Sequence, residues 1–155
     1  MNNFEGKTAV VTGGGGGIGE AMCRLFASKG MNVVVSDIDS SAAEKVADTL
    51  AATGVKSFAV TSDVSDRDSV KNLADKAFEE MGNVHILCNN AGVVSFAPIH
   101  EQSERDWDWV IGVDLNGVLY GVQSFLPRML ANGEDGHIIN TSSSAGLYAF
   151  PGIGP

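Results

Sequence analysis

The sequence predicts an α/β fold of the Rossmann type, a doubly wound parallel sheet with helices on both faces. Five short apolar runs of strand length alternate with segments whose apolar residues recur at helical spacing. A glycine-rich stretch from Thr12 to Gly19 stands between the first apolar run and the first helical pattern. In parallel sheets, this strand-to-helix turn is where nucleotide phosphates bind.

The first predicted unit is a strand, a glycine loop and a helix. Residues 8–11 form a short apolar run, and apolar side chains from Ile18 to Phe26 recur on one helical face. Glycines permit positive φ, and they let a pyrophosphate approach the main-chain N–H groups at the start of the helix. A glycine run by itself more often indicates a flexible linker. The strand before it and the helix after it favour nucleotide binding instead.

The alternation then continues along the chain. A strand at 32–36 precedes a helix that is predicted to begin with a capping box from Ser41 to Glu44. A strand at 57–61 precedes a helix over 70–81 that Gly82 closes. The buried face of the earlier of these two helices is predicted to comprise Ala43, Val46, Ala47 and Leu50.

The last predicted elements are a strand at 84–88, a long helix at 103–131 and a strand at 137–141. Asp114 falls on the apolar stripe of that helix, seven residues after Trp107. We therefore predict that Asp114 is buried and paired or water-linked, because an unpaired buried carboxylate is costly. The predicted buried stripe comprises Trp107, Val110, Ile111, Leu115, Val118, Leu119 and Val122.

Composition limits the classes of protein that fit. The 155 residues are 44% hydrophobic, enough for one domain over 1–155. A net charge of −9 opposes binding to nucleic acid, and the chain shows no membrane-spanning run or signal peptide, so we expect a cytoplasmic protein without a membrane partner. Cys23 and Cys88 form no Cys-x-x-Cys pair and are predicted to be reduced and buried. The three histidines are scattered, so we predict no metal site.

The loop chemistry indicates which nucleotide would bind. Glu20 and Ala21 follow Gly19, so the Lys-Ser/Thr of a P-loop is missing and a dinucleotide remains. Asp37 ends the second strand, where a carboxylate accepts hydrogen bonds from ribose hydroxyls and repels a 2′-phosphate. This predicts NAD as the cofactor rather than NADP. Alternatively, Asp37 caps a turn near Ser40.

Three motifs then stand at strand ends in a familiar order, namely Thr12-Gly13-x-x-x-Gly17-Ile18-Gly19, Asp63-Val64 and Asn89-Asn90-Ala91-Gly92. With them the chain resembles the short-chain dehydrogenase/reductase family over all 155 residues, which correspond to the family's cofactor-binding first part. The resemblance implies that Asp63 contacts the adenine amino group and Val64 its ring, and that Asn90, Ala91 and Gly92 line the adenosine side. From the residues alone, these positions also fit ordinary strand-to-loop turns.

The resemblance also implies a catalytic serine after the last strand, with the register favouring Ser143 over Ser142. In the family this hydroxyl polarises the substrate oxygen, while the tyrosine of a Tyr-x-x-x-Lys motif transfers the proton. A helix cap or a solvated loop is the alternative for the serine triplet.

The chain departs from the family pattern in two places. No Tyr-x-x-x-Lys occurs in the 155 residues, and we expect the natural protein to continue beyond Pro155. Asp114 stands where the family carries Asn in Asn-Leu-x-Gly. Our hypothesis is that Asp114 belongs to the proton-relay region. The alternative is an acid on the helix surface.

These inferences predict an NAD-dependent oxidoreductase that moves hydride between a secondary alcohol and a ketone, with a small-molecule substrate. The apolar excess on the long helix and the family resemblance suggest a homodimer or homotetramer. The competing hypothesis is a noncatalytic dinucleotide-binding or regulatory module that lacks the catalytic tyrosine naturally.

Overall fold

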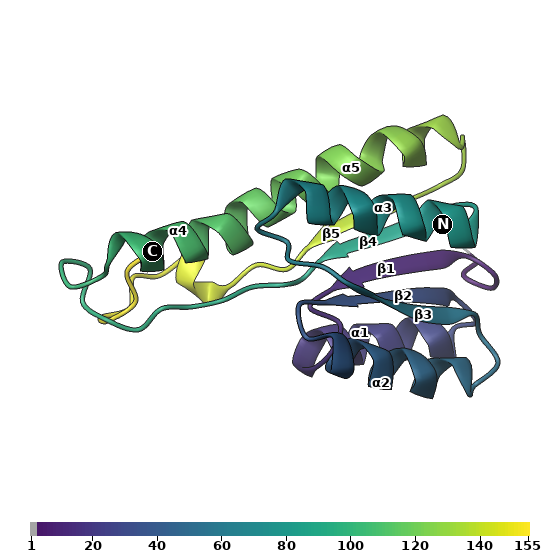
Figure 1. Cartoon of the computed structure of the whole chain (residues 1–155), viewed down its shortest axis with the longest axis horizontal. Helices are drawn as coiled ribbons and strands as arrows, with labels where there is room; N and C mark the ends of the chain where they lie inside the picture. Colours follow the sequence, from purple (N-terminus) through teal and green to yellow (C-terminus); the bar gives the residue numbers. More distant parts are fainter. Residues whose placement is uncertain (1–2) are drawn as a thin grey trace.

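The computed structural model describes residues 3–155 and contains a parallel five-stranded sheet in the order β3-β2-β1-β4-β5 (Figure 1). The chain runs outward from the central strand β1 to β3, then crosses to β4 and β5 on the other side. The predicted doubly wound α/β fold is confirmed. The strands are β1 Thr8–Thr12, β2 Asn32–Asp37, β3 Ser57–Thr61, β4 Ile86–Asn89 and β5 His137–Asn140.

Helices cover both faces of the sheet (Figure 1). Helices α1 (Gly17–Ser28) and α2 (Ser40–Ala51) cover one face, and α3 (Arg67–Met81) and α5 (Gly117–Ala131) cover the other. Successive strand residues point to opposite faces. In β2, Val33 and Val35 accordingly pack with α1 and α2, whereas Val34 packs with α3 and α5. Both faces of the central strands are therefore buried, which explains their continuous apolar runs.

The start of α2 differs from the prediction. The N-cap is Asp39, whose side chain accepts a hydrogen bond from the Ala42 N–H at 3.1 Å. The helix therefore begins at Ser40, and the predicted capping box at Ser41 is wrong because an aspartate two residues earlier already satisfies the free N–H. The predicted buried face of α2 and the role of Gly82, which ends α3 with φ +75°, are confirmed.

The predicted long helix is present as a continuous run with a π-helical middle. Ser103 caps α4 (Glu104–Val110) in a reciprocal box with Asp106, the π-helix η1 spans Ile111–Asn116, and α5 follows directly. The predicted buried stripe is correct at Val110 but wrong at most positions, because Trp107, Ile111, Leu115 and Leu119 are exposed and Val118 and Val122 are only half-buried. The buried residues of these helices are Val110, Gly112, Val113, Gly117, Gly121, Phe125 and Met129. A π-helical turn holds more residues than an α-helical turn and so shifts the phase of the helix that follows.

Two glycines explain which face of α5 is buried. A Cβ added at Gly121 would lie 2.2 Å from the Asn89 Oδ1 atom, and one added at Gly117 would lie 3.0 Å from Val64 Cγ2. The helix backbone thus lies directly against β4 and the segment after β3. A small-residue face also covers the sheet in α1, where Gly19, Cys23 and Ala27 are buried while Ile18 and Leu25 are exposed.

A hydrogen-bond network joins the amino end of β1 to the residues just before β4. The buried His85 accepts a hydrogen bond from the Thr8 N–H at its Nδ1 (3.0 Å), and its Nε2 lies 3.1 Å from the Glu134 Oε2 atom. Glu134 also accepts from Asn83 Nδ2 at 3.0 Å and from the Lys7 ammonium. Hydrogen bonds from Lys7, Asn83 and His85 lower the pKa of Glu134 to about 2.

Both cysteines are free and buried, which confirms the prediction. Burial raises the pKa of each thiol to about 12. No helix between residues 3 and 155 has both the length and the apolar character needed to cross a bilayer. Over the same residues, no group of three or more His, Cys, Asp or Glu side chains is arranged to hold a metal ion.

Candidate functional site

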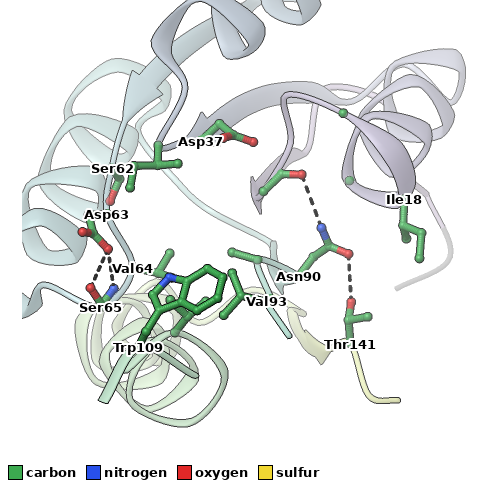
Figure 2. A pocket seen from close by; sticks show the side chains of 17 residues that line it. Ile18, Asp37, Ser62, Asp63, Val64, Ser65, Asn90, Val93, Trp109 and Thr141 are labelled. Carbon is green, nitrogen blue, oxygen red and sulfur yellow. Dashed lines mark hydrogen bonds between the residues drawn. The ribbon is translucent and has the colours of Figure 1, made fainter. Parts of the chain in front are cut away.

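A cleft of about 660 Å³ opens at the carboxyl ends of the strands (Figure 2). It lies where the chain direction reverses between β1 and its neighbours β2 and β4, which is the position where open α/β sheets bind ligands. Of the eleven predicted cofactor residues, the cleft is lined by nine, namely Gly13, Ile18, Gly19, Asp37, Asp63, Val64, Asn90, Ala91 and Gly92. Thr12 and Gly17 do not line it.

The glycine loop has a conformation that other residues would disturb. Gly13 and Gly17 have φ values of +64° and +53°, in the left-handed region that favours glycine. A Cβ at Gly19 would lie 2.0 Å from the Gly13 carbonyl oxygen. Gly17 therefore acts through the backbone turn, although its own atoms do not line the cleft.

The start of α1 supplies free donors to the cleft. Gly16 is the N-cap and lines the cleft, but it has no side chain to occupy the N–H groups of the first turn. These N–H groups have no partner within the helix. Because Ile18 and Gly19 of that first turn also line the cleft, the arrangement suits a bound phosphate.

Asp37 is held in place by hydrogen bonds to the glycine loop and to the turn after β2. Its Oδ2 atom accepts a hydrogen bond from the Gly15 N–H at 2.9 Å, and its Oδ1 accepts from the Asp39 N–H at 3.0 Å. The carboxyl group thus caps the turn after β2 and also lines the cleft. Each carboxylate oxygen retains a lone pair that can accept a hydrogen bond from a hydroxyl. No lysine or arginine is among the residues that line the cleft.

The far end of the cleft combines one carboxyl group with an apolar wall. The Asp63 Oδ1 atom accepts hydrogen bonds from the Ser65 N–H (2.9 Å) and the Ser65 hydroxyl (2.7 Å). Val64 and Val113 are 8% and 9% exposed and belong to one small apolar cluster. This end therefore offers both a hydrogen-bond acceptor and an apolar surface to a ligand.

Thr12 and Asn90 hold the strand ends together beneath the cleft. The Thr12 hydroxyl donates to the Cys88 carbonyl (3.3 Å) and accepts from the N–H groups of Asn90 (3.0 Å) and Ala91 (3.1 Å). The Asn90 amide donates to the Thr12 carbonyl (3.0 Å). Its oxygen accepts a hydrogen bond from the Thr141 hydroxyl (3.1 Å), which Figure 2 shows. These side chains position the loops that line the cleft.

The two predicted catalytic residues lie apart from this network. Ser143 is exposed and caps the short 3₁₀-helix η2 (Ser144–Gly146), its Oγ accepting from the Ala145 N–H at 3.1 Å. Within residues 3–155, no hydrogen bond joins Ser143 to Asp114. The sequence therefore correctly identified a helix cap as one use of this serine.

Asp114 is exposed, so the prediction that it is buried on the apolar stripe is wrong. It lies in the π-helix, whose extra residues turn its side chain toward the loop after β4. The Oδ1 atom accepts a hydrogen bond from the Val93 N–H at 2.9 Å. Partial desolvation raises the pKa of Asp114, and the hydrogen bond from Val93 opposes this rise.

Eight residues of the cleft were not named individually from the sequence, although Gly16 lies within the glycine stretch that was predicted to bind phosphate. Ile38 and Ser62 directly adjoin the predicted Asp37 and Asp63, so the strand-end rule could have included them. Trp109 could not have been found in this way, because helical periodicity does not show that α4 reaches the cleft. The eight residues are Gly16, Ile38, Ser62, Ser65, Val93, Trp109, Val113 and Thr141.

The chain is similar to several known proteins. A C alpha-dehydrogenase from Sphingobium sp. is 37% identical over 100% of this chain and 51% of its own length. A cyclohexanol dehydrogenase from Acinetobacter sp. is 39% identical over 98% of this chain and 61% of its own length. The crystal structure of a short-chain dehydrogenase/reductase from Burkholderia phymatum in complex with NAD superposes with a TM-score of 0.96 at 46% identity, covering 99% of this chain and 55% of that one. The chain thus spans little more than half the length of these relatives.

The family model described as short chain dehydrogenase matches residues 7–155. The matched region contains the glycine loop, Asp37, Asp63 and the Asn-Asn-Ala-Gly motif, parts of which the structure brings to one cleft. The chain belongs to the short-chain dehydrogenase/reductase family.

Proposed function

We propose that the whole protein is an NAD-dependent oxidoreductase that moves hydride between a secondary alcohol and a ketone. The observation that carries this proposal is the cleft itself, where the start of α1 faces an anchored Asp37 carboxylate without a nearby cation. NAD, when bound, accepts or supplies the hydride. The protein's contribution is to bind the dinucleotide, orient it and polarise the substrate.

Each part of the cleft suits one part of NAD. The free N–H groups near Gly16 and Gly19 would hold the pyrophosphate, because their partial positive charge faces the cleft. Asp37 would accept hydrogen bonds from the ribose hydroxyls of the adenosine half. Asp63 and Val64 would contact the adenine, and Asn90, Ala91 and Gly92 would line the adenosine side.

Ser143 and Asp114 have separate proposed roles. The Ser143 hydroxyl would donate a hydrogen bond to the substrate oxygen and stabilise the charge that develops there. Asp114 accepts the Val93 N–H and so holds the loop after β4, beside the proposed adenosine side. We propose that it also belongs to the proton-relay region.

The comparisons support the enzyme over the noncatalytic module. The relatives described above are named as dehydrogenases, and the Burkholderia phymatum protein was solved with NAD. For the assembly we propose a homodimer or homotetramer, because Ile111, Leu115 and Leu119 expose apolar surface along the long helix.

NAD and NADP titrations by calorimetry test the cofactor assignment, with the full natural chain. We expect the wild type to prefer NAD. Asp37→Ala should lower the affinity for NAD about tenfold or more, because hydrogen bonds to a charged group are lost. It should also reduce the ratio between the affinities for NAD and NADP. Asp48→Ala, an exposed acid on α2, is the matched control and should change neither affinity. A wild-type preference for NADP would overturn the assignment.

Activity with a panel of secondary alcohols tests the role of Ser143. Ser143→Ala should lower kcat by roughly 10²–10³, the usual effect of removing one donor to a developing oxyanion, with little change in NAD affinity. Ser142→Ala is the matched control and should retain most activity. The opposite result would move the catalytic role to Ser142.

A further inference from the structure

Trp109 is an aromatic side chain that lines the cleft instead of a core. It lies on α4, and 47% of its surface is exposed. Figure 2 shows its indole between the Asp63–Ser65 segment and Val93. Trp107, two residues earlier and 37% exposed, does not line the cleft. The two tryptophans therefore differ in location although their exposure is similar.

Trp109 continues the apolar wall at the far end of the cleft. Val113 lies four residues later in the same helical run, and both side chains line the cleft with Val64. The two valines are almost fully buried, whereas the indole is half exposed. Among the described residues, Trp109 belongs to none of the buried core clusters. Its ring therefore offers free aromatic surface to whatever occupies this end.

A second apolar side chain that lines the same cleft is also exposed. Ile38 follows Asp37 at the end of β2, lines the cleft and is 68% exposed. Asp63 lines the cleft as well and supplies a carboxylate, whereas no lysine or arginine lines it. A flat, uncharged ring with polar edges fits this combination of surfaces better than a sugar or a phosphate does.

We propose that Trp109 is a specificity-determining residue that contacts the purine base of the dinucleotide through its indole ring. This inference rests on the proposed function, since it assigns one residue within the dinucleotide site. Aromatic side chains hold nucleic-acid bases by stacking, because every base has a π-face. Trp109 thus raises the affinity of the cleft for ligands that contain a purine base, relative to ligands that lack one.

The experiment uses the full natural chain with NAD, 5′-AMP and nicotinamide mononucleotide as probes, each titrated by calorimetry. Trp109→Ala should weaken 5′-AMP and NAD about tenfold and leave nicotinamide mononucleotide unchanged. Trp109→Phe keeps an aromatic ring and should stay within about threefold of the wild type. Trp107→Ala is the matched control and should bind all three probes as the wild type does.

Fluorescence supplies an independent readout of the same contact. Titration with 5′-AMP should quench tryptophan emission in the wild type and in Trp107→Phe, and this quenching should disappear in Trp109→Phe. Wild-type affinity for 5′-AMP in Trp109→Ala, with an unchanged melting temperature, would overturn the role of Trp109 while the NAD assignment stands. If the wild type binds neither NAD nor 5′-AMP, the proposed function itself fails and this inference fails with it.

Discussion

At the scale of single residues, Thr12 shows how one hydroxyl organises the cleft without lining it. Its hydroxyl donates one hydrogen bond and accepts two, and all three partner groups belong to the end of β4 or the loop after it. The side chain is 4% exposed, so water cannot replace these bonds. The threonine is therefore a positioning residue for Asn90 and Ala91.

Thr12→Val tests this role with almost unchanged volume. The partly buried N–H groups of Asn90 and Ala91 lose their acceptor, so we expect the free energy of unfolding to fall by about 1–3 kcal/mol. Urea denaturation measures the change. Thr61→Val, at the exposed end of β3, is the control and should stay within about 0.5 kcal/mol of the wild type. Equal stability of the two variants would contradict the positioning role.

Glu134 gives stability a predictable pH dependence. Its pKa is about 2 in the folded protein, below the ordinary value of 4.5. A lowered folded pKa stabilises the protein above the unfolded pKa, and this contribution is lost as the pH falls from about 4.5 toward 2. Glu134→Gln should therefore have a lower urea midpoint than the wild type at pH 6, and the difference should shrink across that window.

The matched control for this titration is Glu79→Gln, an exposed acid on α3. Its urea midpoint should follow the wild type at every pH. A difference between Glu134→Gln and the wild type that stays constant down to pH 2 would contradict the role of the Glu134 charge.

At the scale of elements, the sequence predicted the buried face of a helix correctly where apolar side chains form that face. The buried face of α2 was predicted correctly, since Ala43, Val46, Ala47 and Leu50 recur at helical spacing. The buried faces of α1 and α5 were not predicted correctly, because Gly19 brings the backbone of α1 against the Gly13 carbonyl and Gly121 brings that of α5 against Asn89 of β4. A pattern of apolar residues does not reveal such a contact, because glycine has no side chain that would contribute to the pattern.

Gly121→Ala tests the close contact between α5 and β4. The added Cβ would lie 2.2 Å from Asn89 Oδ1, and the Asn89 side chain is itself held by Asn140 at 2.9 Å. The helix must shift, and we expect a loss of about 1–3 kcal/mol in the free energy of unfolding. Gly146→Ala has open space around its Cβ and should change stability little. Denaturation curves of both variants decide the matter.

At the scale of the whole molecule, the cleft joins parts of the chain that are distant in sequence. Residues at the end of β2, directly after the other four strands, and in the α4–η1 run contribute to it. A ligand that binds only the folded protein should therefore stabilise the entire sheet. At a free concentration 100 times its Kd, NAD should add about 2.7 kcal/mol to the free energy of unfolding.

Urea denaturation with and without NAD measures this linkage. NADP at the same concentration is the control, and it should stabilise the protein less because Asp37 repels the 2′-phosphate. Equal stabilisation by both dinucleotides would contradict the proposed selection by Asp37.

Much of this architecture could be predicted from the sequence, but the cleft only in part. Alternating strand and helix patterns indicated the sheet and its two layers, and strand ends indicated Asp37 and Asp63. The position of Trp109 depends on how far α4 extends past the sheet, and the exposure of Asp114 depends on the π-helix. Both are set by three-dimensional packing, which local periodicity does not encode.

The His85–Glu134 network lies at the end of β4 away from the cleft, with four strand residues between His85 and Asn90. At a rise of about 3.3 Å per residue, the backbones of His85 and Asn90 are roughly 16 Å apart. Substitutions that strengthen the fastening at one end are therefore expected to add to those that alter ligand choice at the other, because sites this distant seldom interact. The stability of this protein can therefore be raised at the His85–Glu134 end without changing the affinity or selectivity of the cleft for its ligand.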